Sequence, residues 1–461
     1  MKKQIFQALR EQILKGSMEA GEELPSTREL AQQLKVSRNT VSEAYDMLIT
    51  EGYVISRQGA PTRVSEGLCM NINTAAVPLP PKKNHPPIKI DFHTGRPDLS
   101  SFPYYLWRQL MYRTAEDLPM ELLGYTNPQG MVTLRTEIAA WLSRSKGLSV
   151  EADDIFITTG ATQALHIITG VLELKGKPVA MEDPCNKGIL KTFLNSGCDI
   201  LPIPVDEHGL QTKQLDKTNA AAVYVTPSHQ FPLGGILPAG RRAELIRYAR
   251  EHQLYLLEDD YDSEFRYSGE PISPLYAMDP LRVIYIGTFS KVLFPALRIG
   301  YVILPRELQT RWCEQRTYTD VQSSPFEQAA LAEFLKTRKF DRHIRSMRHL
   351  YRERRSVLLT ALSAAFGDTW HAWGDSAGLH LVVEFDGISF DDAFFKSCYS
   401  SGLRIVSVEQ HSIQKGHHDN KLLMGYGHLE QQAIQDGIKL LQSIIQSSFE
   451  IKSETAPDHL S

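Results

Sequence analysis

The sequence predicts an α/β protein in which a small helical module precedes a larger domain built on a mostly parallel sheet. Its 461 residues exceed the roughly 100–200 residues of a single domain. Residues 91–450 alternate short β-rich runs with helical segments, which is typical of such a sheet with helices on both faces. Residues 67–90 hold five prolines and few large apolar side chains. We therefore expect a module over 1–66, a Pro-rich linker over 67–90, a large domain over 91–450 and a polar tail over 451–461.

The composition is that of an average globular protein, with 42% hydrophobic and 23% charged residues. No apolar run reaches the roughly 18 residues of a transmembrane helix, and the charged N-terminus lacks the apolar stretch of a secretion signal. The five cysteines are scattered and form no CxxC pair, so we expect no metal site, no disulfide framework and a reducing cytoplasm. Because the net charge is −4, any nucleic-acid binding must come from a local patch.

Three helices and a hairpin are predicted in the first module, over residues 2–15, 27–34, 38–51, and 53–56 paired with 62–64. Ser26 is a good N-cap for the second helix, and Glu29 stands where a capping box needs its acid. Ser37 caps the third helix, whose apolar residues recur on one stripe. The opposite face carries small polar, Arg and Asn side chains at its N-terminus, which suits insertion into a major groove, with the hairpin as a wing.

Two interpretations of this module stay open on pattern alone, namely DNA binding and a small helical oligomerisation cap. Charge does not decide between them, because residues 1–66 carry nine Lys or Arg and nine Asp or Glu.

The segment LPSTRELAQQLKVSRNTVSEAYDMLITEGYV resembles the winged helix-turn-helix of the GntR regulator family almost position for position. The resemblance implies that four side chains face DNA and that a glycine lies at the wing tip: Arg28, Arg38, Asn39, Thr40 and Gly59. The wing segment GAPTRV departs from the glycine-richer turn of that family.

In the large part, strands are predicted over residues 154–158, 178–181, 221–225, 254–257 and 283–286. A helix begins near Thr162 after the first of them, and another covers 241–251. In a parallel sheet the ligand binds beyond the C-terminal ends of the strands. The polar residues that follow each strand are therefore the candidates for a site.

A lysine and an acid pair follow two of these strands. In GTFSKVLFPALRIGY, Lys291 can form a Schiff base with an aldehyde once its amine is neutral, and Thr288 and Arg298 can hold a phosphate. In LEDDYDSEFRY, a carboxylate such as Asp259 facing a pyridine nitrogen keeps that nitrogen protonated. Tyr261 can hydrogen-bond a ring hydroxyl.

Two further segments add to this constellation. TTGATQAL offers backbone N–H groups at Gly160, Ala161 and Thr162, and phosphate favours such a helix start. GYTNPQGMVTLR offers the phenol of Tyr125. Each signal alone has a structural explanation, such as a solvated lysine, a polar loop or an ordinary N-cap. Their occurrence together at successive strand ends is what indicates a site.

In this order the signals resemble the fold-type I aminotransferases that use pyridoxal 5′-phosphate, over residues 91–450. TPSHQFPLGG, EDDYDSEFRY and HIRSMRHLYRERR resemble the MocR-type regulators, in which a GntR module is fused to an aminotransferase-like sensor. The resemblance implies the fold-type I sheet with a small C-terminal α+β subdomain, and a cofactor bound through Lys291 as the catalytic lysine. It also implies a domain-swapped homodimer in which Tyr125 reaches the other subunit's phosphate.

The basic segment HIRSMRHLYRERR has two interpretations, a second DNA-binding strip or a structural helix with a solvated face. Its similarity to the sensor domain favours the structural helix.

Three positions depart from the aminotransferase pattern. Leu423, in KLLMGYGHL, stands where aminotransferases hold the substrate carboxylate with an arginine, a bidentate pair that is a large part of amino-acid binding. Asn186 replaces a common ring-stacking aromatic, and Phe231 replaces an asparagine. Arg96, in FHTGRPDLSSFP, lies in a segment that enters the substrate side of this fold and is a candidate for the missing cation.

The sequence therefore predicts a transcription regulator that binds double-stranded operator DNA and pyridoxal phosphate, and senses the cofactor or a small amine or amino-acid effector. Leu423 argues against net enzymatic turnover. Two alternatives stay open: a working aminotransferase with an appended helix-turn-helix module, and a DNA-binding scaffold that has lost its cofactor.

Overall fold

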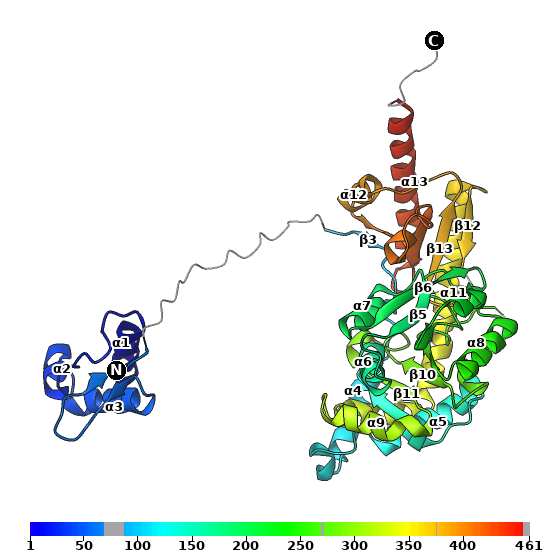
Figure 1. The fold of residues 1–461 in the computed structure, drawn as a ribbon. Coiled ribbons are helices and arrows are strands. Elements are labelled where there is room, and N and C mark those ends of the chain that lie inside the picture. The colour runs from blue at the N-terminus through cyan, green and yellow to red at the C-terminus, as the bar shows by residue number, and fades with distance from the viewer. Residues whose placement is uncertain (69–86, 269–271, 375, 455–461) are drawn as a thin grey trace. The chain divides into compact units, whose positions relative to one another are not determined.

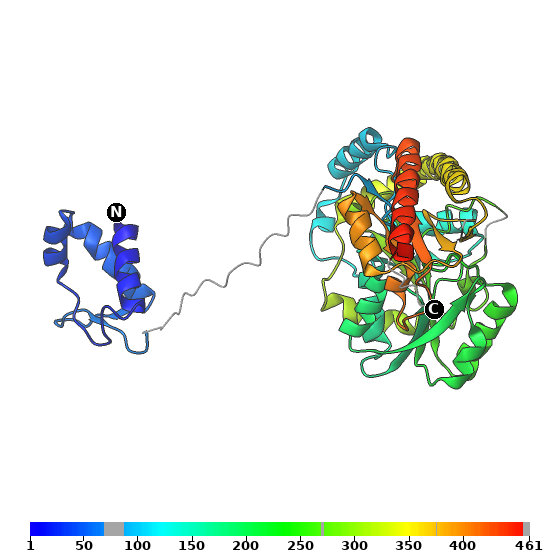
Figure 2. The ribbon, with the colours of Figure 1, turned by 90° about the horizontal axis from the view of Figure 1, so that it is seen from above.

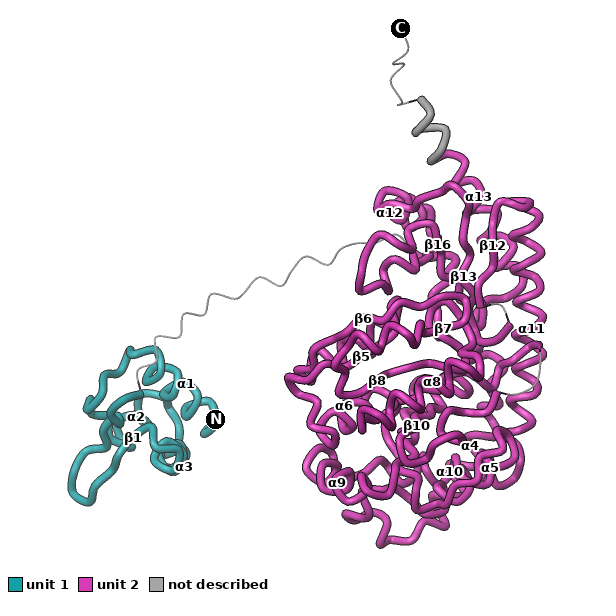
Figure 3. The backbone as a smooth tube through the Cα atoms, turned by 45° about the vertical axis from the view of Figure 1, so that its right-hand side comes forward, with its two compact units in different colours: residues 1–84 teal, residues 85–461 magenta. Residues whose placement is uncertain are grey.

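The computed structural model describes residues 1–68, 87–268, 272–374 and 376–454, and the side chains up to residue 447 (Figure 1). The chain forms two compact units, Met1–Asn84 and His85–Ser461 (Figure 3). The predicted linker lies outside the described residues over 69–86, and the predicted tail does so over 455–461. None of the described helices is both long enough and apolar enough to cross a bilayer.

The first unit contains three helices and a two-stranded hairpin, drawn in blue in Figures 1 and 2. Its elements are α1 (Lys2–Leu14), α2 (Thr27–Leu34), α3 (Arg38–Thr50), β1 (Val54–Ile55) and β2 (Arg63–Val64). The strands are antiparallel, and Val54 pairs with Val64. The predicted capping box is confirmed, because the Glu29 N–H donates to Ser26 Oγ and the Ser26 N–H donates to the Glu29 carboxylate. This cap fixes where α2 begins.

The buried stripe of α3 holds the first unit together. Val41, Ala44 and Leu48 are fully buried against apolar side chains of α1 and of the hairpin. The polar N-terminus of α3 consequently stays exposed, which leaves it free to contact a partner.

The second unit is built on an eight-stranded sheet with the order β4-β11-β10-β9-β8-β5-β6-β7. Its strands are β4 (Ile155–Thr158), β5 (Pro178–Asp183), β6 (Asp199–Asp206), β7 (Gly209–Leu210), β8 (Ala222–Val225), β9 (Tyr255–Asp260), β10 (Val283–Thr288) and β11 (Gly300–Ile303). The run from β10 to β6 is parallel, whereas β11 and β7 pair antiparallel with their neighbours. The predicted α/β class with a mostly parallel sheet is confirmed.

Helices cover both faces of this sheet. The covering helices are α4 (Tyr104–Glu116), α5 (Val132–Lys146), α6 (Ala161–Val171), α7 (Lys187–Asn195), α8 (Ala239–Glu251), α9 (Arg306–Thr317), α10 (Pro325–Lys336) and α11 (Lys339–Phe366). Phe156 and Leu257 pack with α6, α7 and α9 in one apolar cluster. Their strand neighbours Ile155 and Leu256 pack with α5, α8 and α10 in another. Strands buried on both faces in this way read as continuous apolar runs in the sequence.

A smaller four-stranded sheet lies in the C-terminal part of the same unit, with the order β12-β13-β16-β15. Its elements are β12 (Trp370–Trp373), β13 (His380–Phe385), α12 (Asp392–Ser400), β15 (Val406–Ser407), β16 (Lys421–Gly425) and α13 (Gln431–Glu454). In Figure 2, α13 in red runs beside α11 in yellow, and the two helices pack together. A separate two-stranded ribbon pairs β14 (Leu403–Arg404) with β3 (Ile90–Asp91). The ribbon joins the N-terminal segment of this unit to its C-terminal part.

The end of one predicted strand differs in detail from the structure. The strand predicted over 254–257 extends to Asp260, so Asp259 and Asp260 end β9 instead of following it. These acids are accommodated in the sheet because Tyr224 donates to Asp259, while Lys146 and Tyr285 donate to Asp260.

The basic segment within α11 contributes to the structure of the second unit. Arg354 is buried and pairs with Asp98 at 2.8 Å. Arg348 donates two hydrogen bonds to the Glu264 carbonyl. These contacts support the structural interpretation of the basic helix over a second DNA-binding strip.

Candidate functional site

The predicted cofactor residues of the second unit converge on one cavity of about 530 Å³. It lies at the C-terminal ends of β9 and β10 and at the start of α6. The predicted residues that line it are Gly160, Ala161, Thr162, Asp259, Tyr261, Thr288, Lys291 and Arg298. Residues that are far apart in the chain are thus brought to one place, as expected beyond the ends of parallel strands.

Lys291 places a partly buried amine in this cavity. Its Nζ donates to the Gly95 carbonyl at 2.8 Å. Burial lowers the pKa of Lys291, and the nearby carboxylates of Asp262 and Asp259 oppose that change. A lowered pKa increases the fraction of neutral amine, which is the form that attacks a carbonyl carbon. Gly95 has φ +74°, a conformation that favours glycine, and a Cβ there would displace the flexible end of the Lys291 side chain.

Asp259 presents a buried carboxylate to the same cavity. Its Oδ2 accepts a hydrogen bond from the Tyr224 hydroxyl at 2.6 Å, and its Oδ1 has no hydrogen-bond partner among the described residues. Burial raises the pKa of Asp259 to about 6, although the Tyr224 hydrogen bond acts in the opposite direction. An unpartnered carboxylate oxygen in such a place fits a cationic N–H donor, such as a protonated pyridine nitrogen.

An anion site is formed where α6 begins. Gly160 has φ +111° and precedes the first turn of α6, whose leading N–H groups have no partner within the helix. The Arg298 guanidinium is close by, because a Cβ on Gly160 would lie 3.1 Å from its Nη2. Thr288 and Ser290 also line the cavity, and the Ser290 hydroxyl has no partner within the described part of the chain. This set of donors fits a phosphate group.

Sequence reasoning missed Ser290 and the residues behind Tyr261. The His229 Nδ1 faces Asp262 Oδ1 at 2.9 Å, and the Tyr261 hydroxyl lies 3.1 Å from the same nitrogen. Burial by itself lowers the pKa of His229, but the Asp262 carboxylate raises it overall. These contacts orient the Tyr261 phenol. Ser290 directly precedes Lys291, and that adjacency was the available signal.

The three departures from the aminotransferase pattern also line the cavity. Leu423 is fully buried on β16 and offers no charge. The Asn186 side chain caps α7, since its Oδ1 accepts from the N–H groups of Gly188 and Ile189. Phe231 packs edge-on against His411, with ring centroids 5.2 Å apart. The cavity consequently lacks an arginine at the position of Leu423.

Arg96 is not among the residues that line the cavity. Its Nη1 donates to Asp91 Oδ2 at 2.9 Å, and its side chain is 49% exposed. The hypothesis that Arg96 supplies the missing cation therefore receives no support from the geometry of the cavity.

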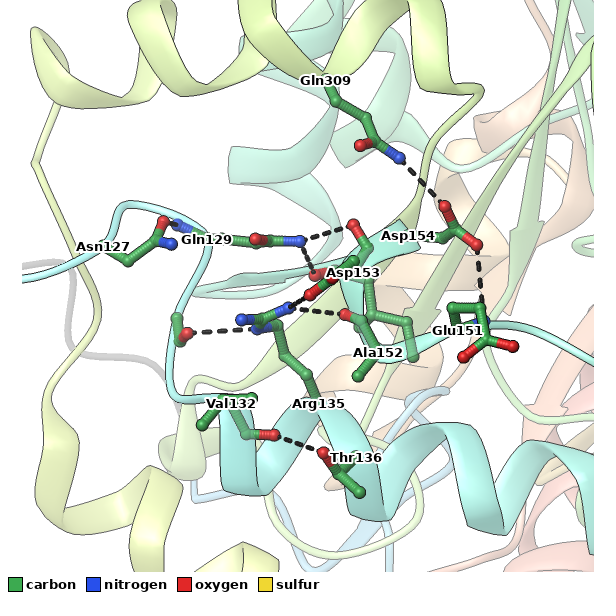
Figure 4. A network of polar contacts seen from close by, with 12 residues as sticks. Asn127, Gln129, Val132, Arg135, Thr136, Glu151, Ala152, Asp153, Asp154 and Gln309 are labelled. Atoms are coloured by element: carbon green, nitrogen blue, oxygen red, sulfur yellow. Dashed lines mark hydrogen bonds and ion pairs between the residues drawn. The ribbon is translucent and has the colours of Figure 1, made fainter.

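Tyr125 lies outside the cavity and is 92% exposed. The loop that carries it is firmly attached to the sheet edge, as Figure 4 shows for its C-terminal half. Gln129 donates to the carbonyls of Asp153 and Ile155, and Arg135 donates to that of Ala152. An exposed aromatic side chain on an anchored loop is well placed to contact another protein chain.

In the first unit, the predicted DNA-facing residues lie around the start of α3 and on α2. Arg28, Arg38 and Asn39 are exposed, and Thr40 is partly buried. The Arg38 Nε donates to the Thr27 hydroxyl at 3.3 Å, which holds the two helices' polar ends together. Gly59 has φ +79° at the exposed end of the hairpin, a conformation that favours glycine.

Comparison with known families divides the chain in the same two parts. Residues 1–64 match the family described as bacterial regulatory proteins, gntR family. Residues 87–416 match the family described as aminotransferase class I and II.

Three curated relatives resemble this chain over nearly its whole length. An uncharacterized HTH-type transcriptional regulator of Bacillus subtilis, YdeL, is 33% identical and covers 95% of this chain and 96% of its own. The probable rhizopine catabolism regulatory protein MocR of Rhizobium meliloti is 31% identical, and the match covers 96% of this chain and 93% of that protein. The HTH-type pyridoxine biosynthesis transcriptional regulator PdxR of Corynebacterium glutamicum is 32% identical, and the match covers 92% of this chain and 91% of that protein.

Among solved structures, the fold resembles the kynurenine aminotransferase of Pyrococcus horikoshii, in a crystal structure that contains PMP. The TM-score is 0.72 at 27% identity, with 79% of this chain and 92% of that chain covered.

Proposed function

Because this chain belongs to the MocR-type HTH transcriptional regulators, which join a gntR-family module to a domain of the aminotransferase class I and II family, we propose that it is a regulator whose operator binding depends on pyridoxal phosphate. Its first unit binds operator DNA and its second unit holds the cofactor in the cavity. One observation carries the proposal: a partly buried lysine amine, a buried carboxylate oxygen without a partner among the described residues, and an anion site converge on a single cavity.

The residues of the cavity divide into three groups of contacts for the cofactor. The start of α6, with Thr288, Ser290 and Arg298, would hold the phosphate. Asp259 would hold the ring nitrogen, and Tyr261 the ring hydroxyl. When bound, pyridoxal phosphate supplies an aldehyde that reacts with primary amines and a ring that withdraws electrons. Lys291 would keep the aldehyde in place through its amine, whose lowered pKa favours the neutral form.

The exposed aromatic side chains of the second unit support a homodimer. Tyr104, Tyr105 and Tyr112 of α4 are 64%, 72% and 67% exposed, and Tyr125 in the loop that follows is 92% exposed. Four large exposed rings within residues 104–125 are unusual for a monomer and are typical of an interface. We propose that a second copy covers these rings, and that Tyr125 of the partner subunit completes the phosphate site.

Two gntR-type units in a dimer imply two DNA half-sites. The effector, either the cofactor or a small amine, changes operator affinity only if it binds two arrangements of the domains with different affinity. Leu423 offers no positive charge for the carboxylate of an amino acid. This favours the cofactor itself as one effector.

A working aminotransferase is the alternative, since the lysine and the acid of that chemistry are both in place. The apolar Leu423 argues against it, because the carboxylate of an amino-acid substrate lacks its arginine there. Steady turnover of an amino donor with a keto acid would favour the enzyme.

Operator binding measured against cofactor tests the proposal. The full chain first selects its sites from a pool of random duplex DNA, and the selected duplex is then titrated by fluorescence anisotropy with and without pyridoxal phosphate. We expect the affinity to change with cofactor in the wild type and not in Lys291→Ala. If the wild type binds the selected DNA with the same affinity with and without pyridoxal phosphate, the proposed dependence is refuted.

A further inference from the structure

The cavity carries two cationic side chains that the cofactor contacts above do not use, Lys187 and Arg404. Lys291 and Arg298 are the other cations in its described lining, and Asp259 and Asp262 are the carboxylates there. Asp259 accepts from Tyr224 and would hold the ring nitrogen, and Asp262 faces His229. The remaining part of the cavity is therefore positively charged.

Arg404 reaches the cavity from β14, next to the position of Leu423. Val406 is the cross-strand partner of Leu423, and both residues line the cavity. Arg404 lies two residues before Val406 and lines the same cavity. The intervening Ile405 is buried and is not in the lining. A guanidinium thus lines the same cavity as Leu423, the position where aminotransferases keep theirs.

The charge of Arg404 is incompletely compensated. Its register partner on β3 is Asp91, but the Arg404 Nη1 lies 3.6 Å from Asp91 Oδ2, beyond hydrogen-bonding distance. That same oxygen accepts a hydrogen bond from Arg96 at 2.9 Å, and Asp91 Oδ1 accepts one from the His93 N–H. Within the described residues the Arg404 guanidinium donates no hydrogen bond. Arg96 and Arg404 therefore share the Asp91 carboxylate, whose two oxygens already accept hydrogen bonds from Arg96 and from the His93 N–H.

The neighbouring imidazoles do not offset this charge. His93 and His411 both line the cavity. Burial lowers the pKa of each ring, to about 4 for His411, and the cations Arg404 and Lys187 lower the values of His93 and His411 further. Both rings are neutral near pH 7 and remain available as hydrogen-bonding groups. An anion entering this part of the cavity would meet positive charge, and the carboxylate nearest to Arg404, that of Asp91, is already hydrogen-bonded to Arg96 and is not in the described lining of the cavity.

We propose that Arg404 binds the carboxylate of a small effector that also carries a primary amine, and so replaces from β14 the arginine that Leu423 lacks on β16. The inference rests on the proposed function, because the amine is taken to act at the cofactor site. Arg404 is then the residue that makes the regulator discriminate amino acids from plain amines. Arg96 does not share this role, because it is bound to Asp91 and does not line the cavity.

Pairs of ligands that differ only in the carboxylate test the proposal. L-Alanine is compared with isopropylamine, and glycine, β-alanine and longer ω-amino acids are compared with the n-alkylamines that lack their carboxylate. Each ligand is titrated into the cofactor-loaded full chain, and binding is followed by calorimetry and by the change in the visible absorbance band. We expect at least one amino acid to bind roughly ten- to a hundredfold more tightly than its amine, the range of a charge-assisted hydrogen bond.

Three variants locate the source of this preference. Arg404→Gln should remove most of the preference, since the charged hydrogen bonds to the carboxylate are lost while the contact with the amine remains. Arg96→Gln changes the other arginine on Asp91, and Lys191→Gln changes an exposed cation of α7 that does not line the cavity. Lys191→Gln should keep the wild-type preference, whereas Arg96→Gln should keep it only in part, because Asp91 is then free to pair with Arg404. If Arg404→Gln does not retain cofactor, Arg404→Lys replaces it, and the preference should fall several-fold because lysine lacks the two-pronged fork.

The outcomes separate this inference from the proposed function. A wild type without a visible band after addition of pyridoxal phosphate would refute the proposed function and, with it, the inference. A wild type that shows the band and binds amino acids no better than amines would overturn the inference alone. A preference lost in Arg96→Gln but retained in Arg404→Gln would assign the carboxylate to Arg96 and would also overturn it.

Discussion

Replacing Asp259 with asparagine should change two properties of the protein in opposite directions. Burial raises the pKa of Asp259 from an ordinary value of 3.8 to about 6. A shift of about two units corresponds to ~3 kcal/mol of unfavourable charge burial in the cofactor-free protein. Because the pKa is raised in the folded state, this cost is complete above pH ~6 and disappears as the pH falls below the ordinary value of the carboxyl.

The neutral amide of Asp259→Asn keeps an acceptor for the Tyr224 hydroxyl and removes the charge. We therefore expect the cofactor-free variant to unfold at higher temperature than the cofactor-free wild type at pH ~8, with a gain of up to ~3 kcal/mol and about half of that near pH ~5. Thermal unfolding followed by calorimetry at both pH values measures the difference. A variant that is no more stable than the wild type at the higher pH would show that the carboxylate does not carry this cost.

The affinity for pyridoxal phosphate should change in the opposite direction, with the wild type binding more tightly than Asp259→Asn. The charged hydrogen bond from a ring nitrogen to Asp259 is worth ~1.5–3 kcal/mol, so the variant should bind pyridoxal phosphate roughly ten- to a hundredfold more weakly. Glu258→Gln is the matched control, since Glu258 is a buried acid of the same strand that accepts from Leu275 and Tyr276 and does not line the cavity. Equal affinity in Asp259→Asn and the wild type would refute the assignment of Asp259 to the ring nitrogen.

Three further substitutions test separate parts of the molecule. Gly160→Ala places a Cβ 3.1 Å from the Arg298 guanidinium at φ +111°, so we expect a loss of ~1–3 kcal/mol in stability and weaker cofactor binding, measured by thermal unfolding and titration. Ser26→Ala removes the capping box of α2 and should cost about 1 kcal/mol, seen as faster amide exchange in that helix of the full chain. Arg38→Ala should weaken binding to selected DNA by ~1–3 kcal/mol, whereas Lys15→Ala, directly after α1, should not, as measured by anisotropy over a salt series.

The elements with strong local signals could be predicted from the sequence. The Ser26 and Glu29 pair predicts the first residue of α2, and the structure contains the expected capping box. The stripe of α3 predicts its buried face, because a periodicity of 3.6 residues admits one buried side. Strand ends are less certain. Polar residues such as Asp259 and Asp260 signal a strand's end, yet side-chain partners from other elements keep them in β9.

The parts of the site that depend on tertiary pairing could not be predicted. Arg404 follows an unremarkable glycine-leucine step in the sequence and gains its significance only because β14 pairs with β3 and β15 pairs with β16. His229 supports Tyr261 from a loop more than thirty residues earlier in the chain. Arg96 was predicted to supply the missing cation because its segment enters the substrate side of this fold. In the structure Arg96 donates to Asp91 and does not line the cavity. Contacts between distant segments leave no periodic trace in a sequence.

The visible absorbance spectrum of the purified full chain beside Lys291→Ala tests the central claim most directly, because it asks whether this lysine holds pyridoxal phosphate in this cavity. After addition of the cofactor and removal of the excess, the wild type should keep a visible band that Lys291→Ala lacks. Both proteins should show the same far-ultraviolet circular dichroism, since the substitution leaves the sheet and its helices unchanged. A wild type that keeps no band, or a Lys291→Ala protein that keeps the same band, would contradict the claim.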